Sequence, residues 1–194
     1  MALLFWKLLS NTLQEWGFKI YEYDQCVANK IIKGKQCTII WQVDDLKISH
    51  VDKRAVEDVL KQLTTKFGQD APLTTCRGKI LDYLGMKIDY CRKGKVTFSM
   101  ENYIKQILEE APYDMEGIAK TPAACHLFNI NDGAKKLLEE QAQLFHHIVA
   151  KLLYICWRTR QDIQMAEDFL STRVKCPDED NYKKLVQVIQ YLRC

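Results

Sequence analysis

The sequence predicts an α+β fold, in which a half that mixes sheet and helix is followed by a helical half. Up to residue 98, short runs of aromatic and β-branched residues alternate with helical patterns, whereas from residue 99 onward the apolar residues recur mainly at helical spacing. The 194 residues are enough to bury a core in one large domain or two small ones. We therefore expect two regions, 1–98 and 99–194.

The first half opens with a predicted helix over residues 3–16, which Gly17 ends. Four runs rich in strand-forming residues follow, at 18–23, 26–32, 36–43 and 46–50. Short polar turns separate the first three runs: Asp24-Gln25 and Lys33-Gly34-Lys35. We expect the second, third and fourth runs to pair as an antiparallel meander.

A well-marked helix is expected after the meander, with Asp52 as its N-cap and Gly68 as its end. Between these residues the apolar side chains recur on one face of the helix. The segment 69–81 is expected to be a loop.

A hairpin should follow this loop, with strands at 83–91 and 96–98 around a turn at 92–95. Ser99 is the expected cap of a helix that ends before Pro112. Loop residues dominate 112–135, and the remainder is predicted to be helical. Two apolar stripes mark these last helices: Phe145, Ile148, Val149, Leu152, Leu153 and Cys156, then Leu185, Val188, Ile189 and Leu192.

Composition places the chain among globular proteins, since 47% of residues are hydrophobic and 27% are charged. The net charge of +3 comes from basic and acidic residues that are interleaved, so composition alone does not establish a nucleic-acid partner. The eight cysteines are widely spaced, and reduced thiols are favoured over disulfides. Cys26, Cys37, Cys91 and Cys156 fall within apolar patterns, where cysteine acts as a small hydrophobe.

The apolar opening, Met1 to Leu9, lacks a basic region before it, and Lys7 interrupts it. It therefore does not fit a signal peptide. No apolar stretch reaches the roughly 18–20 residues that span a bilayer. We expect a soluble intracellular protein (cytoplasmic or nuclear) with no membrane partner.

Asp44 and Asp45 lie side by side between two apolar strands, where a hairpin turn normally prefers Asn-Gly or Asp-Gly. Adjacent carboxylates repel each other, and a hard divalent cation such as Mg²⁺ would remove the repulsion. A pair of such ions can hold the attacking and leaving oxygens of a phosphoryl transfer. The alternative is an ordinary exposed acidic turn.

The segment from Trp41 to His50 resembles the Tyr-Val-Asp-Asp strand-turn-strand of Ty1/copia-type retrotransposon reverse transcriptases. Tyr83-Leu-Gly-Met-Lys-Ile-Asp89 is similar to the Tyr/Phe-Leu-Gly block of that family, and Phe98 to Leu108 resembles the block that follows. Further segments resemble the family in order and rough spacing: Phe5–Leu8, Trp16–Phe18, Thr121-Pro122, Leu152–Tyr154, Thr159–Ile163 and Val188–Leu192. The similarity covers essentially the whole chain.

This resemblance implies an RNA-directed DNA polymerase, with part of a palm over 1–98 and a helical thumb-like region over 99–194. It implies that Asp44 and Asp45 are catalytic Mg²⁺ ligands in a two-ion site and that Gln42 and Val43 lie near the substrate. Three further residues would form part of a primer grip: Leu84, Gly85 and Met86. The implied partner is an RNA or DNA template-primer.

The chain also departs from the family pattern. Gln42 stands where an aromatic residue is usual, and Gln161 replaces the proline of an Arg-Pro-Asp-Ile block. The family's first catalytic carboxylate belongs to an earlier strand that no segment of this chain matches. Asp44 and Asp45 share one turn and cannot surround two ions alone, so we expect little or no polymerase activity from this chain.

Two alternatives come from other functional classes. The chain could be a module that binds nucleic acid or protein without catalysis, or a decayed reading frame with no selected function. The histidines are expected to have structural or surface roles because no His-x-x-x-His occurs. The tryptophans are expected to pack in the core or at an interface, and the apolar N-terminal segment predicts an exposed patch and self-association.

Overall fold

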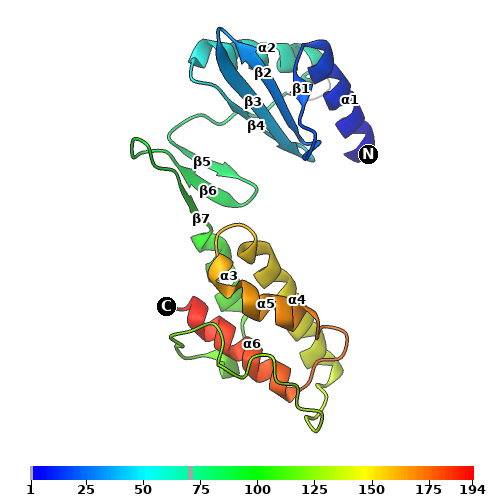
Figure 1. Cartoon of the computed structure of the whole chain (residues 1–194), viewed down its shortest axis with the longest axis vertical. Coiled ribbons are helices and arrows are strands. Elements are labelled where there is room, and N and C mark those ends of the chain that lie inside the picture. The colour runs from blue at the N-terminus through cyan, green and yellow to red at the C-terminus, as the bar shows by residue number, and fades with distance from the viewer. Residues whose placement is uncertain (1, 70–71) are drawn as a thin grey trace. The chain divides into compact units, whose positions relative to one another are not determined.

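In the computed structural model of this chain, which describes residues 2–69 and 72–194, helices and strands form the predicted α+β architecture (Figure 1). The described residues contain six α-helices and two antiparallel sheets, of four and three strands. The chain divides into two units, Met1–Leu84 and Gly85–Cys194. The palm-like region 1–98 and the thumb-like region 99–194 were inferred from the family resemblance, and this division stays a prediction.

The first unit contains a four-stranded sheet in the order β1-β2-β3-β4 and two helices. Its elements are α1 (Ala2–Glu15), β1 (Lys19–Ile20), β2 (Val27–Ile32), β3 (Lys35–Gln42), β4 (Asp45–Ser49), α2 (Lys53–Phe67) and β5 (Ile80–Tyr83). The meander predicted from β2 to β4 is confirmed. The run at 18–23 is a strand for only two residues, because Asp24 begins a turn in which its carboxylate accepts from the Cys26 N–H at 2.9 Å.

The core of this unit lies where the helices cover one face of the sheet. Alternate residues of β3 are buried, namely Cys37, Ile39 and Trp41, as the two-residue period of a strand requires. They belong to one cluster with Leu9 and Leu13 of α1 and with Val59 and Leu63 of α2. The opposite face of β3 carries less buried side chains, and so the sheet is covered on one side by its own unit.

Both predicted boundaries of α2 are confirmed. The Asp52 side chain accepts from the Arg54 N–H at 2.9 Å, and the Gly68 N–H donates to the Thr64 carbonyl at 2.9 Å. Glycine fits this end because a Cβ at position 68 would lie 2.6 Å from that carbonyl oxygen.

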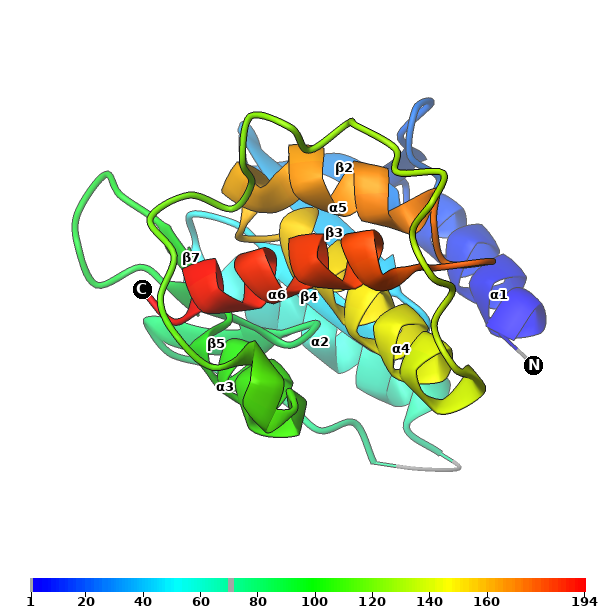
Figure 2. The ribbon, with the colours of Figure 1, turned by 90° about the horizontal axis from the view of Figure 1, so that it is seen from below.

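The second unit contains the β6–β7 hairpin and the remaining helices (Figure 2). Its elements are β6 (Met86–Asp89), β7 (Thr97–Ser99), α3 (Glu101–Glu110), η1 (Tyr113–Met115), α4 (Glu139–Cys156), η2 (Gln161–Ile163), α5 (Gln164–Ser171) and α6 (Glu179–Leu192). The predicted hairpin is confirmed, with Lys87 paired to Ser99, but its first strand is Met86–Asp89 and not the expected 83–91, because Leu84 and Gly85 form a turn. The three-stranded sheet has the order β5-β6-β7. The expectation of a loop over 69–81 is wrong at residues 80 and 81, which belong to β5, a strand of only four residues.

Two local predictions in this unit are wrong. Ser99 belongs to β7, and the N-cap of α3 is Met100, which is buried. The Ser99 hydroxyl accepts from the Glu101 N–H only at 3.4 Å. Cys91, which was expected to act as a small hydrophobe, is exposed. The short β6–β7 hairpin leaves both residues near its ends, where the strand pattern no longer decides burial.

The helical core of this unit forms where α4 packs with α5 and α6. The stripe predicted on α6 is confirmed, since its four members are buried: Leu185, Val188, Ile189 and Leu192. On α4, Leu152 is buried, whereas Leu153 is 40% exposed and Ile155 is buried in its place. Adjacent helical residues point in different directions, and the sequence alone did not decide which of them faces the core.

The structure pairs none of the eight cysteines in a disulfide, and Cys37 and Cys156 are buried. Burial raises the pKa of both thiols, which disfavours the reactive thiolate. The described helices include none that has both the length and the apolar character needed to cross a membrane.

Replacing Leu152 by Ala should lower the free energy of unfolding by about 2–5 kcal/mol, because it opens a cavity in the helical core. The matched change, Leu153→Ala on the same helix, removes a partly exposed side chain and should cost under about 1 kcal/mol. Urea unfolding followed by circular dichroism measures both. Equal losses for the two variants would show that the core is assigned to the wrong face of α4.

Candidate active-site turn

The connection between β3 and β4 is a two-residue turn that presents two carboxylates. Gln42 pairs with Asp45 across the hairpin, so only Val43 and Asp44 lie between the paired residues. All four residues are exposed. The turn therefore combines two adjacent acidic side chains with a backbone that ligands can reach.

Val43 has a left-handed backbone, with φ of 52°. Two other short turns also begin with a left-handed residue, Lys33 at 50° and Leu84 at 51°, but each is followed by a glycine at 73°. Paired positive φ angles of that kind suit tight hairpins, and glycine adopts them without a steric cost. The Val43 turn has no glycine, and its left-handed residue is β-branched.

A left-handed conformation costs about 1–2 kcal/mol for a residue with a Cβ, and a β-branched residue in it is an outlier. Val43 does not recover this cost through packing, because its side chain is 58% exposed. Strained backbone of this kind is concentrated at active sites and ligand-binding turns. The conformation of Val43 therefore distinguishes this turn from an ordinary acidic loop.

Tyr83 lies close enough to the turn for Asp45 to affect its pKa, and this position was not predicted from the sequence. Burial raises the pKa of Tyr83, and the negative charges near it, Asp45 first among them, act in the same direction. Tyr83 is the last residue of β5 in the first unit, and it precedes Leu84 directly. Its position in the Tyr-Leu-Gly block is the sequence signal that could have directed attention to it.

The donor set of the turn suits a hard cation, because carboxylate oxygens are the ligands that Mg²⁺ prefers. Asp44 and Asp45 could supply two such groups. Among residues 2–69 and 72–194, however, no cluster of three or more His, Cys, Asp or Glu side chains is placed to hold a metal ion. The turn alone therefore offers part of a coordination shell, to which phosphate oxygens and water would have to contribute.

The three residues predicted as a primer grip lie in different environments. Leu84 is half-buried at the end of the first unit, and Gly85 is exposed at the start of the second. A Cβ at Gly85 would lie 3.4 Å from the Tyr154 hydroxyl, and Met86 packs against the helical core. Met86 therefore has a packing role in its own unit, and the primer-grip role of all three stays a prediction.

The remaining candidates separate into surface and core residues. His147 is exposed and bonds to Glu110 at 3.1 Å; Lys151 and His147 together lower the pKa of that carboxyl.

Trp41 is buried, as predicted. Trp157 is 66% exposed and so lies outside the core, and for this residue the expected packing at an interface stays a prediction. Trp157 is the cap residue of α4, where the helical stripe has ended.

Comparison with curated proteins gives a distant similarity to a transposon protein. A curated Saccharomyces cerevisiae protein described as a transposon Ty5-1 protein is 23% identical over 184 residues. The match covers 95% of this chain, and the chain spans 58% of the length of the yeast protein. No protein-family model matches the chain. No solved structure matches it. The similarity supports an origin in a transposable element.

Replacing Val43 by Gly should raise the free energy of unfolding by about 1 kcal/mol, because glycine removes the left-handed strain. Val51→Gly is the matched control, since Val51 is 78% exposed and has no positive φ. That control should lower stability by up to about 1 kcal/mol through the entropy of the unfolded chain. Thermal unfolding measures both; a loss of stability in the Val43 variant would show that the turn is unstrained.

Proposed function

We propose that this chain is part of a Ty1/copia-type reverse transcriptase, an RNA-directed DNA polymerase, and that Asp44 and Asp45 are carboxylate ligands of its catalytic Mg²⁺. Three observations support the proposal: the ordered sequence blocks, the similarity to a transposon protein over 95% of the chain, and the geometry of the turn. The observation that carries it is the strained Val43, next to two exposed carboxylates.

The β3–β4 hairpin explains how these residues would act. Strand pairing from Thr38–Ser49 to Gln42–Asp45 fixes both arms of the turn. The carboxylates are thereby held at its tip, where a phosphate-bearing substrate can approach. A bound Mg²⁺ would polarise the phosphoryl oxygens and stabilise the charge that develops in nucleotidyl transfer. Asp44 and Asp45 would hold the ion, and the exposed backbone at Gln42 and Val43 would border the substrate.

We further propose that this site needs a carboxylate from another segment. Two side chains on adjacent residues cannot surround two ions, and the described residues bring no third carboxylate to the turn. The family pattern supplies that group from an earlier strand. The template-primer is the proposed partner, and its binding requires more of the protein than this turn.

We expect the 194-residue chain to extend a primer by no more than background, whether Mg²⁺ or Mn²⁺ is supplied. The measurement is incorporation of labelled nucleotide on an RNA template with a DNA primer, with Asp44→Asn as the matched control. Synthesis that depends on Asp44 would show that the chain holds a complete site. Fusion to an upstream polymerase segment of a related element should restore Asp44-dependent synthesis, and its failure to do so would contradict the proposed role of the turn.

A further inference from the structure

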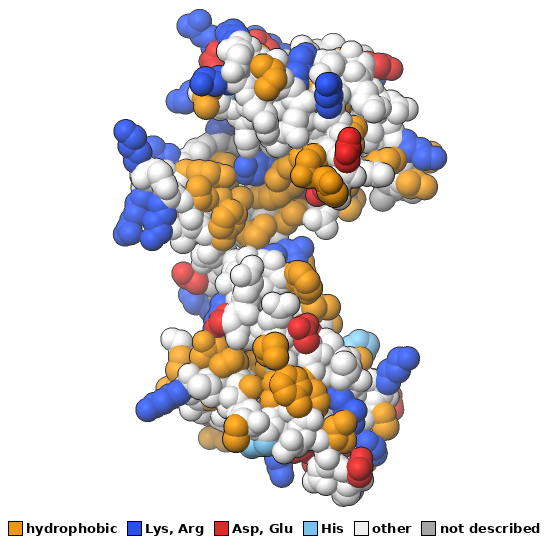
Figure 3. Space-filling view, in the orientation of Figure 1, with side chains coloured by type: hydrophobic (Ala, Val, Ile, Leu, Met, Phe, Trp, Pro, Cys, Tyr) orange, Lys and Arg blue, Asp and Glu red, His pale blue; other side chains and the backbone are white. Residues whose placement is uncertain are grey.

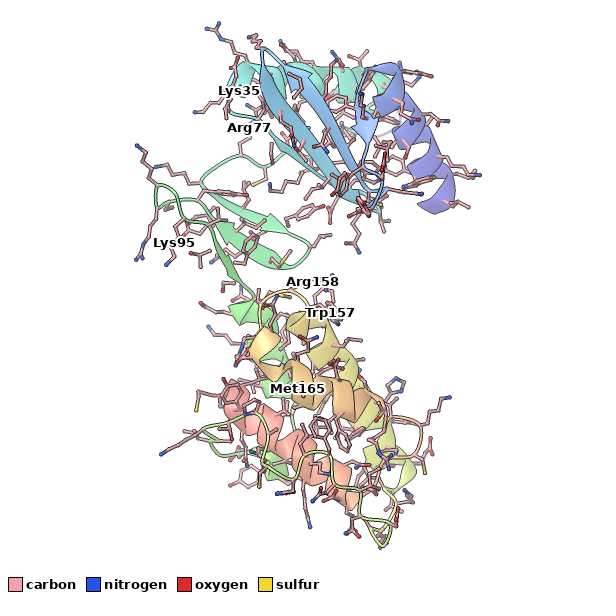
Figure 4. All side chains as sticks on the ribbon, viewed as in Figure 1. Lys35, Arg77, Lys95, Trp157, Arg158 and Met165 are labelled. Atoms are coloured by element: carbon pink, nitrogen blue, oxygen red, sulfur yellow. The ribbon has the colours of Figure 1, made fainter. Side chains whose placement is uncertain are left out.

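The side chain of Glu167 is enclosed in the helical core of the second unit. Figure 3 shows acidic side chains on the surface of this unit, where charged groups are usually found. Glu167 is instead 0% exposed. It lies on α5, where Met165, two residues earlier and labelled in Figure 4, is 63% exposed. The carboxyl group of Glu167 therefore belongs to the face of α5 that packs against other helices.

The surroundings of this carboxyl group supply only part of the hydrogen bonding that a carboxylate needs. The Ser171 hydroxyl, one turn further along α5, donates to Oε1 of Glu167. Oε2 is buried and has no hydrogen-bond partner among the described residues. A buried carboxylate that lacks such partners is costly, whereas its neutral, protonated form costs much less. The geometry therefore favours the protonated form of Glu167.

Within the part of the chain that the structure describes, no cation forms an ion pair with Glu167. The helix α5 packs against α4, α6 and η2. From α6, the buried Lys184 pairs with Asp180 at 2.7 Å. From η2, Asp162 is itself an acid and pairs with Arg160. These elements thus bring no compensating positive charge to Glu167.

The nearest titratable groups also disfavour the ionised form of Glu167. Burial raises the pKa of its carboxyl group, the charge of Asp168 acts in the same direction, and the Ser171 hydrogen bond opposes them. On α4, burial raises the pKa of the Cys156 thiol, and the Glu167 charge adds to that shift. A neutral thiol gives a carboxylate little compensation, because S–H is a weak donor.

We propose that Glu167 is a pH-sensitive switch in the helical core of the second unit. With a neutral carboxyl group, α5 packs firmly against α4 and α6. When the group ionises as the pH rises, α5 loosens. The helix is sensitive to this change because it has only eight residues, Gln164–Ser171, and so short a helix depends on tertiary packing. The switch is independent of the metal site proposed at Asp44 and Asp45.

The direction of the pH dependence follows from the raised pKa of Glu167. In the unfolded chain its carboxyl group has the ordinary glutamate pKa of about 4.3. The folded chain keeps the proton up to a higher pH, so the contribution to stability is complete below the unfolded pKa and is lost as the pH rises through the folded pKa. Glu110 and Asp162 have lowered pKa values and act in the opposite direction, since their contributions are lost as the pH falls.

The experiment is urea unfolding of the full chain at several pH values between about 5 and 8, around the range in which a raised carboxyl pKa titrates. The unaltered chain is compared with Glu167→Gln, which keeps the shape of the side chain and cannot ionise. Between the unfolded and folded pKa values, the unfolding equilibrium constant of the unaltered chain should rise by up to about tenfold per pH unit relative to that of the variant. At the upper end of the range the variant should be the more stable of the two.

Ser171→Ala distinguishes a switch from a merely structural role. The change removes the donor to Oε1 and raises the folded pKa of Glu167 further, so the loss of stability should extend to a higher pH. Glu109→Gln is the matched control, because Glu109 is an exposed glutamate on α3. This control should keep the pH dependence of the unaltered chain.

Amide hydrogen exchange measures whether the loosening is local. The unaltered chain and Glu167→Gln are compared at the same pH, so that the intrinsic exchange rates cancel. At the upper end of the pH range, the amides of α5 should exchange faster in the unaltered chain than in the variant, and those of α6 should exchange alike.

Two results would overturn the proposal. The first is the same pH dependence of unfolding in the unaltered chain and in Glu167→Gln. The second concerns the carboxyl carbon signal of Glu167 in nuclear magnetic resonance, identified by its loss in that variant. Titration of this signal at or below the ordinary glutamate pKa of about 4.3 would show that the folded chain does not retain the proton.

Discussion

The two-residue turn at Val43 and Asp44 is the constraint on which the first unit depends. Because strand side chains alternate, a slip of one residue between β3 and β4 would turn the partly buried, core-facing side chains of β4 away from the core. The observed register pairs Trp41 with Leu46 and Ile39 with Ile48, and all four belong to the cluster under α1 and α2. The short connection that preserves this register forces Val43 into a left-handed conformation. The strain at Val43 and the exposure of the two carboxylates thus both result from the short connection between β3 and β4.

Regular elements with long periodic patterns were predictable from the sequence. The β2–β4 meander, the capped helix α2 and the buried stripe of α6 each follow from spacing and from end signals such as Asp52 and Gly68. The strand β5 was missed, since its four residues are too few to establish a period. An element was more predictable when its pattern of apolar residues extended over a longer segment.

The candidate site was predictable only in part. Asp44 and Asp45 were predicted as site residues because paired carboxylates can bind a divalent cation. Their catalytic role was implied by the resemblance of the ordered sequence blocks to the family. The left-handed conformation of Val43 was not predictable, because valine normally avoids it and the turn contains no glycine that would indicate it. Exposure of Trp157 was equally hidden, since the helical stripe of α4 ends just before it and tertiary packing decides what covers the next residue.

We propose that the strained turn positions Asp44 and Asp45 for a divalent cation. Nuclear magnetic resonance of the labelled chain during Mn²⁺ titration tests it most directly, because the paramagnetic ion broadens the amide signals nearest its site. Signals from Gln42 to Leu46 should broaden first, and Asp44→Asn together with Asp45→Asn should abolish the effect. Broadening that begins elsewhere, or that persists in the double variant, would contradict it.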